Sequence, residues 1–147
     1  MLCGAGELSA PFLLTMGDHL FDSSVIRQVA AQGNRRELNL AVDRKINTIF
    51  DLDDAMKVRT RENRVIEIGK DLGTYDAIDT GVFLCPVEFF DYLRRAQRDG
   101  DCSLADGVRL MAGDGKVQAI DIGQAWWQDV DTFEMRTRAE EVLSKRA

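Results

Sequence analysis

The chain has 147 residues, of which 45% are hydrophobic and 30% are charged, so it is long enough for one globular domain with a substantial core. Its 19 Lys and Arg against 25 Asp and Glu give a formal net charge of −6, which disfavours nucleic acid as a partner. Three scattered cysteines exclude a disulfide framework and indicate a reducing cytoplasm, and no apolar stretch is long enough to span a membrane.

The first elements expected along the chain are a strand, a helix and a second strand. Residues 11–16 are a short apolar run that ends at Gly17 and Asp18, which is typical of a central strand buried on both faces. Residues 24–31 have apolar positions at helical spacing, and residues 38–42 alternate between apolar and polar side chains, which predicts a strand.

The middle of the chain predicts a loop, a hairpin and a longer strand. Residues 45–55 are irregular and rich in aspartate, so we expect a loop with at most one short strand. The segments 56–60 and 65–68 flank a turn in which Asn63 tolerates positive φ, and this arrangement predicts a β-hairpin. Residues 75–85 contain several β-branched and aromatic side chains and predict a further strand.

The last part of the chain predicts helices alternating with short strands. Helices are expected at residues 86–98, 103–113 and 131–146, and strands at residues 117–122 and 125–127. Ser103 and Asp106 have the spacing of a capping box. Hairpins together with helical crossovers imply an α/β fold, in which helices flank a mixed β-sheet within a single domain.

Three aspartates are candidates for a metal site. Asp18 follows the strand at 11–16, and the ends of strands collect functional groups in such sheets. Asp129 and Asp131 alternate along an extended segment and therefore face the same side. Magnesium requires hard oxygen ligands, but only one or two of these from protein. The alternative is structural, because Asp131 has capping-box spacing to Glu134 and Asp18 can close a turn.

Two further positions have a functional and a structural interpretation. Gly81 interrupts a strand pattern, which indicates a bulge, a close approach to a ligand, or only close packing. Lys70 follows a strand, where its ammonium group either holds a phosphate or stays solvated. His19 is the only histidine and has no recognisable nucleophile motif around it, so neither a hydrolase triad nor a zinc site is expected.

Four segments in chain order carry a family resemblance. Residues 12–21 (FLLTMGDHLF), 65–70 (VIEIGK), 77–83 (AIDTGVF) and 127–132 (WQDVDT) together resemble the sugar-phosphate nucleotidyltransferases, and most closely their inositol-1-phosphate cytidylyltransferase-like branch. The resemblance implies a glycosyltransferase-A-like fold. It also implies transfer of a nucleotidyl group to a sugar or inositol phosphate, by attack of a phosphate oxygen on the α-phosphorus of a nucleoside triphosphate such as CTP.

The resemblance also implies residue roles. Asp18 matches the first metal-binding aspartate of the family, and Asp131 or Asp129 matches the second, with Mg²⁺ as the implied ion. The acceptor-binding residues that it implies are Lys70, Asp79, Thr80 and Gly81. This reaction depends on alignment and charge neutralisation, so no catalytic nucleophile is expected from the protein.

The sequence departs from the family at its beginning. Family members start with a strand that leads into a Gly-rich loop with an Arg and, later, a Lys-Pro pair, and these hold the nucleotide. Gly4-Ala5-Gly6 has neither the strand nor the Arg, and neither proline follows a lysine. We therefore expect an N-terminally incomplete domain that is inactive alone. The alternative function is a catalytically silent binding or assembly module.

An open sheet edge is expected from the same departure. In the family the strand matching residues 11–16 lies beside strands of the part that is lacking, so its outer edge should have lost its partner. An unpaired apolar edge is a template for another chain, and this predicts a homodimer. The competing arrangement has residues 1–10 folded back over the edge within one monomer.

Overall fold

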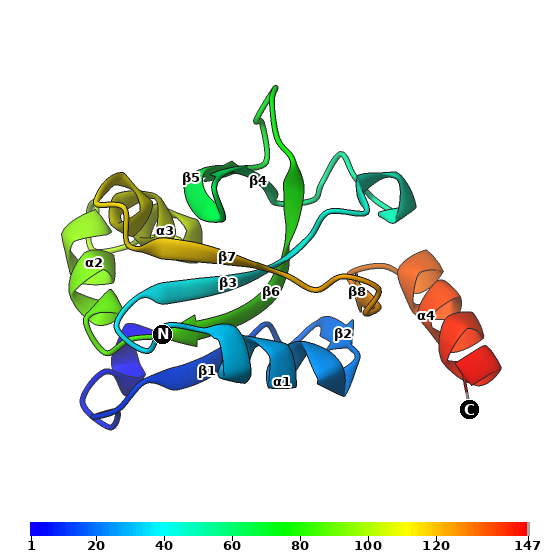
Figure 1. Cartoon of the computed structure of the whole chain (residues 1–147), viewed down its shortest axis with the longest axis horizontal. Helices are drawn as coiled ribbons and strands as arrows, with labels where there is room; N and C mark the ends of the chain where they lie inside the picture. The colour runs from blue at the N-terminus through cyan, green and yellow to red at the C-terminus, as the bar shows by residue number, and fades with distance from the viewer. Residues whose placement is uncertain (147) are drawn as a thin grey trace.

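The computed structural model describes residues 1–146 and shows a six-stranded sheet with helices packed on both faces (Figure 1). The strands are β1 (Phe12–Thr15), β2 (His19–Phe21), β3 (Leu38–Asp43), β4 (Lys57–Arg61), β5 (Arg64–Gly69), β6 (Ala77–Cys85), β7 (Val117–Asp121) and β8 (Trp127–Asp129). The helices are α1 (Ser23–Gln32), α2 (Phe89–Ala96), α3 (Leu104–Gly113) and α4 (Phe133–Arg146), with 3₁₀ turns η1 (Leu2–Gly4) and η2 (Ile46–Thr48). The main sheet has the order β1-β6-β3-β7-β5-β4, and β2 pairs with β8 in a separate small sheet.

The centre of the main sheet consists of β3 and β6. All residues of β3 are buried, because β6 and β7 occupy its two edges and helices cover both faces. The polar Asn39 is tolerated there since its amide donates hydrogen bonds to the carbonyl oxygens of Asn34 and Glu37, at 2.8 Å each. β3 is parallel to β7 and antiparallel to β6, so the predicted mixed sheet and the α/β class are confirmed.

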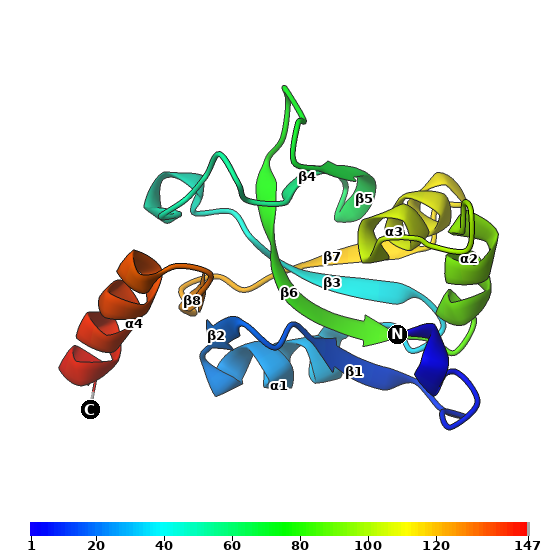
Figure 2. The same cartoon turned by 180° about the vertical axis from the view of Figure 1, so that it is seen from behind.

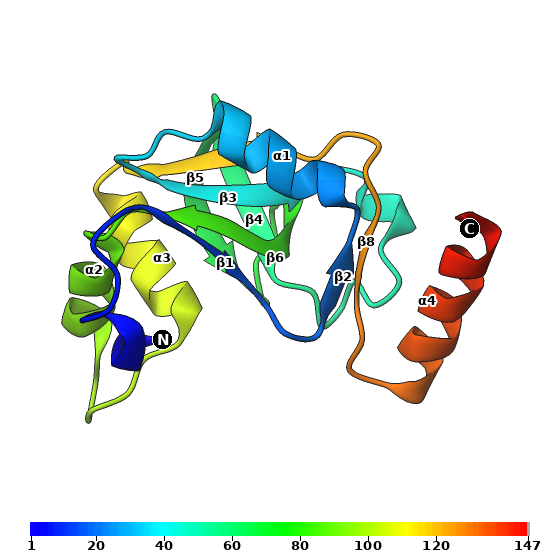
Figure 3. The same ribbon diagram turned by 90° about the horizontal axis from the view of Figure 1, so that it is seen from below.

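Helices cover the two faces of the sheet unequally. α1 lies on one face, and α2 and α3 lie together on the other (Figure 3). In α1 the side chains of Val25 and Val29, four residues apart, are fully buried against the sheet. On the opposite face Phe89 and Met111 are fully buried in the larger core cluster. Each such side chain contributes about 1.5–3 kcal/mol through burial.

The prediction of a central strand at residues 11–16 is wrong. β1 pairs with β6 alone in the part of the chain that the structure describes, and its side chains alternate between half-buried and exposed. Leu13 points outward and is 42% exposed, while Phe12 and Leu14 pack on the core. An edge strand with one covered face shows this alternation, and an apolar run alone does not reveal it.

Local signals place several elements correctly. The hairpin β4–β5 turns at Glu62 and Asn63, which both have positive φ. Ser103 and Asp106 form the predicted capping box at the start of α3. The helix predicted at 86–98 is shorter, since α2 spans Phe89–Ala96 and ends before Gly100.

The C-terminal helix α4 lies at one end of the molecule, apart from the main sheet (Figure 1). It buries only Met135 and Ala139, and Leu143 is 45% exposed. The hydroxyl of Thr132, and not Asp131, caps the helix by accepting a hydrogen bond from the Met135 N–H at 3.2 Å. Among residues 1–146 no helix has both the length and the apolar character needed to cross a membrane.

One edge of β6 is shared by two strands. β1 pairs with residues 82–85 of β6, and β4 pairs with residues 77 and 78 (Figure 2). β3 occupies the opposite edge over residues 78–84. Residues 79–81 therefore lie where β1 and β4 diverge from β6, and there the Asp79 N–H donates to the Met56 carbonyl oxygen at 2.9 Å and the Met16 N–H to the Gly81 carbonyl oxygen at 3.0 Å.

Candidate functional site

A cavity of about 520 Å³ opens where β1 and β4 diverge from β6. Its floor is apolar and includes side chains from the core, and its rim is strongly charged. The charged residues that line it are Asp51, Asp54, Lys70, Asp71, Asp79, Arg109, Asp129 and Asp131. Gly81, His19 and Trp127 complete the wall on the side of β2 and β8. Apart from Asp18 and Thr80, every predicted site residue lines this one cavity.

The small sheet of β2 and β8 brings two of the three candidate metal ligands, Asp18 and Asp131, together. His19 lies opposite Asp129 in the register of the two strands, and the Val130 N–H donates to the Asp18 carbonyl oxygen at 2.9 Å. This pairing sets the carboxylate of Asp18 beside that of Asp131, although 113 positions separate them in the chain. The sequence did not predict β2, and the strand expected at 125–127 begins two residues later.

His19 holds the Asp18 carboxylate in place. Its Nδ1 lies 2.8 Å from Asp18 Oδ1, and its ring stacks on the Trp127 indole with centroids 5.6 Å apart and planes 13° apart. The hydrogen bond from His19 is the main cause that lowers the pKa of Asp18. Asp129 behaves in the opposite way, since burial raises its pKa.

The donor chemistry of this cluster suits a magnesium ion. No group of three or more His, Cys, Asp or Glu side chains with metal-binding geometry occurs within residues 1–146. Asp18 and Asp131 nonetheless form a carboxylate pair, and Mg²⁺ takes one or two protein carboxylates with the remaining ligands from phosphate and water. The residues present therefore fit such an ion.

Lys70 stands at the rim, where it faces carboxylates. Its ammonium group forms an ion pair with Asp54 at 2.6 Å, and both side chains are about half exposed. The hydrogen bond with Asp54 raises the pKa of Lys70, and the negative charges of Asp131 and Asp51 add to the effect. Lys70 is thus a positive charge surrounded by several carboxylates, and it is the only lysine among the residues that line the cavity.

Asp79 and Gly81 line the cavity from β6. The Asp79 carboxylate accepts a hydrogen bond from the Gly81 N–H at 2.7 Å, and burial raises the pKa of Asp79 to about 6. Gly81 has φ +74°, and a Cβ there would lie 2.7 Å from His19 Cδ2. Close packing on His19 therefore accounts for the glycine by itself. Thr80 differs from its neighbours, because its hydroxyl is buried and donates to the Ala41 carbonyl oxygen at 2.8 Å, away from the cavity.

The sequence did not indicate several residues of the cavity. Asp51 and Asp54 come from the loop around η2, which the sequence shows only to be irregular and acidic. Arg109 of α3 donates to the Ile68 carbonyl oxygen at 2.9 Å and pairs with Asp106, and the i,i+3 spacing of this pair on a helix gives no sign of a cavity. Trp127 is recognisable as a strand residue, but nothing local reveals its stacking on His19.

In sequence the chain is similar to part of several longer proteins. It is 32% identical over 143 residues to the bifunctional IPC transferase and DIPP synthase of Thermococcus kodakarensis, which is 96% of this chain and 31% of that protein. It is 35% identical over 134 residues to the protein of the same name from Rubrobacter xylanophilus, or 90% of this chain and 30% of that one. The chain thus spans less than a third of these curated relatives. No protein-family model matches it.

In structure the chain is similar to part of solved nucleotidyltransferases. The inositol-1-phosphate CTP transferase from T. maritima superposes with a TM-score of 0.85 at 27% identity, over 98% of this chain and 59% of the other. A putative glucose-1-phosphate thymidylyltransferase from Bacillus anthracis superposes with a TM-score of 0.80 at 15% identity, over 96% of this chain and 58% of the other, and this likeness concerns the fold.

Proposed function

The chain belongs to the sugar-phosphate nucleotidyltransferase family, and from that premise we propose that its cavity binds the phosphorylated acceptor of nucleotidyl transfer. The acceptor class is a sugar or inositol phosphate, and the donor class is a nucleoside triphosphate such as CTP. One observation carries the proposal: three separate segments of the chain contribute Lys70, Asp79 with Gly81, and Asp129 with Asp131 to the lining of a single cavity of about 520 Å³.

The cavity residues suit the two ends of such an acceptor. The Lys70 ammonium would hold the phosphate, and for this it must exchange its Asp54 partner. The Asp79 carboxylate lines the cavity and can accept hydrogen bonds from hydroxyl groups. Asp18 and Asp131 would hold a magnesium ion, which neutralises phosphate charge when bound. The residues thus position groups and offset charge, and no protein nucleophile is required.

We propose further that the chain alone does not complete the reaction. The Gly-rich segments are poor candidates for a triphosphate loop, because residues 4–6 fall at the end of η1 and residues 113–115 follow helix α3. Neither therefore joins a strand to a helix, as a phosphate loop does. The chain is expected to bind an acceptor but to need another protein segment for the nucleotide.

The test is binding of inositol 1-phosphate and glucose 1-phosphate by isothermal titration calorimetry in the presence of Mg²⁺. We expect saturable binding of at least one acceptor that is lost in Lys70→Met. Lys116→Met is the matched control, because Lys116 is also a half-exposed lysine paired with a carboxylate, Glu88 at 2.9 Å, but lies outside the cavity. Absence of binding by the parent chain contradicts the proposal.

A second assay addresses catalysis. The chain is incubated with CTP, Mg²⁺ and the acceptor that binds best, and released pyrophosphate is measured. We expect no release above the level without protein. Robust pyrophosphate release overturns the proposal that the chain is inactive alone, while acceptor binding without release supports it.

The second candidate function is assembly, and the open edge of β1 favours it. β1 pairs with β6 on one side only, and η1 packs beside α2 without forming a strand along β1, so residues 1–10 do not cover this edge. Unpaired N–H and C=O groups next to the exposed Leu13 offer a template for another strand. We propose a two-fold symmetric homodimer that forms through β1. We propose the cytoplasm as its compartment, because the three cysteines are free and thiols stay reduced there.

Light scattering at micromolar concentration tests the dimer. The parent should have twice the monomer mass, and Leu13→Lys should be monomeric. Leu20→Lys is the control, because Leu20 is 41% exposed on β2 and so is as exposed as Leu13. A folded, monomeric parent rejects the dimer, and a dimer that survives Leu13→Lys places the interface elsewhere.

A further inference from the structure

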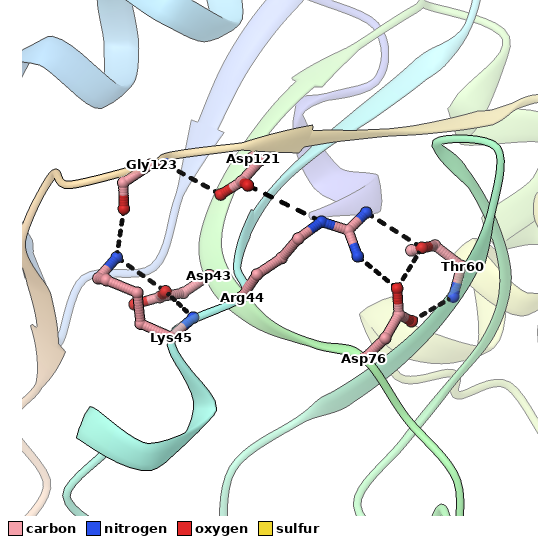
Figure 4. Close-up of polar contacts among 7 residues, drawn as sticks. All are labelled: Asp43, Arg44, Lys45, Thr60, Asp76, Asp121 and Gly123. Atoms are coloured by element: carbon pink, nitrogen blue, oxygen red, sulfur yellow. Dashed lines mark hydrogen bonds and ion pairs between the residues drawn. The ribbon is translucent and has the colours of Figure 1, made fainter.

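Three consecutive residues at the end of β3 form two polar clusters, which meet where the Gly123 N–H donates to the Asp121 carboxylate at 2.9 Å (Figure 4). On one side Arg44 donates to the Asp76 carboxylate and to the Thr60 hydroxyl, and its Nε lies 3.8 Å from Asp121. On the other side Asp43 and Lys45 pair at 2.8 Å. Alternation of side chains at the end of the strand explains why Arg44 faces away from its two neighbours.

The Asp43–Lys45 pair is completely satisfied. The Lys45 ammonium has three donors, and it contacts three acceptors: Asp43 Oδ1 at 2.8 Å, the Gly123 carbonyl oxygen at 2.5 Å and the Ala125 carbonyl oxygen at 3.3 Å. The Asp43 side chain is only 3% exposed. A carboxylate that is so deeply buried persists only when charge and hydrogen bonds compensate it.

The second oxygen of Asp43 connects this pair to the carboxylate cluster. Asp43 Oδ2 accepts a hydrogen bond from the Trp127 Nε1–H at 2.9 Å. The Trp127 indole stacks on His19, and His19 in turn holds Asp18 at 2.8 Å. The contacts therefore form an uninterrupted series from Lys45 through Asp43, Trp127 and His19 to Asp18. Lys45 also fixes the backbone of residues 123–125, which leads directly into β8.

From this series we infer that Asp43 and Lys45 are positioning residues for the carboxylate cluster of Asp18 and Asp131, and that they act through the orientation of Trp127 and His19. The inference rests on the proposed function in taking that cluster as a functional site. Lys45 sets the path of the chain before β8, and Asp43 fixes the rotation of the indole. Together they determine the plane in which the His19 ring lies. They thereby determine which carboxylate oxygen of Asp18 the His19 ring contacts and which one is left to bind a ligand.

The Arg44 cluster provides the contrast. It ties the same end of β3 to the β4–β6 side of the sheet and makes no contact with Trp127 or His19. It reaches the Lys45 contacts through Asp121, which accepts a hydrogen bond from the Gly123 N–H, and Arg44 itself lies 3.8 Å from that carboxylate. If the end of β3 mattered only for stability, loss of either cluster would have the same consequence. If the inference is right, only loss of the Asp43–Lys45 pair disturbs the cavity wall.

The experiment uses the fact that His19 is the only histidine of the chain, so its ring protons give unambiguous NMR signals. Stacking on Trp127 should shift the His19 Hδ2 and Hε1 resonances upfield of their positions in the urea-unfolded protein. We expect this displacement to be reduced or lost in Lys45→Met and retained in Arg44→Met. Lys45→Arg, which keeps the charge and the donors, should restore most of it.

A second variant keeps the test decisive if Lys45→Met does not fold. In Asp43→Asn one carboxylate oxygen becomes an amide donor, which faces either the Lys45 ammonium or the Trp127 N–H, so one contact is lost in either orientation. The His19 signals should again move toward their unfolded positions while the circular dichroism stays native. Unchanged His19 signals in folded Lys45→Met or Asp43→Asn, or an equal change in Arg44→Met, overturn the inference.

Mn²⁺ added to the same samples separates this inference from the proposed function. In the parent, bound Mn²⁺ should broaden the His19 signals. Lys45→Met should need about tenfold more Mn²⁺ for the same broadening, because loss of a residue that supports the metal ligands commonly weakens metal affinity by about this factor or more. Absence of broadening in the parent contradicts the metal site of the proposed function. The positions of the His19 resonances without Mn²⁺ decide the positioning role in either case.

Discussion

At the residue scale, the His19 ring leaves no room for a side chain at Gly81. The φ of Gly81 is +74°, and a methyl carbon added there would lie only 2.7 Å from His19 Cδ2, so Gly81→Ala should lower the free energy of unfolding by more than about 1 kcal/mol. Gly113→Ala is the control, because nothing lies within 4 Å of a Cβ there and alanine favours the helix by up to about 1 kcal/mol. Urea denaturation measures both. Equal effects of the two variants would contradict the close-packing explanation of Gly81.

Asp79 makes a prediction about pH at the same scale. Burial raises its pKa in the folded protein to about 6 from an ordinary 3.8, so the folded state binds the proton more tightly than the unfolded state does. The stability that the folded state gains from binding this proton is fully present below pH 3.8 and is lost as the pH rises to about 6. Asp79→Asn should therefore have little effect near pH 4 and stabilise the fold above about pH 7, by at most about 3 kcal/mol. Urea denaturation across this range checks the prediction, and an advantage that does not grow with pH contradicts it.

At the scale of elements, the β4–β5 turn is defined by two residues with positive φ, Glu62 at 49° and Asn63 at 61°. Such two-residue turns favour Asn followed by Gly, so Glu62→Asn combined with Asn63→Gly should stabilise the protein by about 0.5–1 kcal/mol. Glu62→Val should instead destabilise it by about 1 kcal/mol or more, since β-branched residues disfavour this region. Thermal unfolding measures the stability of both variants. In each of them the carbonyl oxygen of residue 63 should keep its hydrogen bond from the Ala119 N–H, which is 2.8 Å long in the parent. A neutral Glu62→Val variant would contradict the turn geometry.

The elements that local sequence predicts well are those with local causes. The hairpin turn and the capping box of Ser103 and Asp106 each depend on residues within a few positions, and both were predicted. The edge position of β1 and the pairing of β2 with β8 depend on partners far along the chain, and periodicity does not report them. The site follows the same division. Asp131 and Lys70 were candidates from their positions along and after predicted strands and from a resemblance, whereas the contribution of Asp54 depends on how a long loop folds back.

At the scale of the whole molecule, burial predicts an order of local stability. The central strands β3 and β6 have partners on both edges, while β1 has one partner and α4 buries only Met135 and Ala139. Hydrogen exchange should accordingly be slowest in peptides from residues 38–43 and 77–85 and fast in residues 133–146. Residues 12–15 should exchange quickly in dilute protein and more slowly at concentrations where a dimer forms. Slow exchange of residues 12–15 at every concentration would contradict an open edge.

The divergence of β1 and β4 from β6 has a consequence for how such a protein diversifies. The strands that bound the cavity are fixed in register, and a one-residue slip would turn every side chain of a strand to the other face. Under the proposed function, new ligand preferences should therefore arise most readily in the connecting segments, chiefly residues 46–56 before β4 and residues 70–76 after β5. A combinatorial library confined to these two segments should yield mostly folded variants, and under the proposed function these should differ in the acceptor they bind. The same number of changes placed in β4 or β6 should yield mostly unfolded protein.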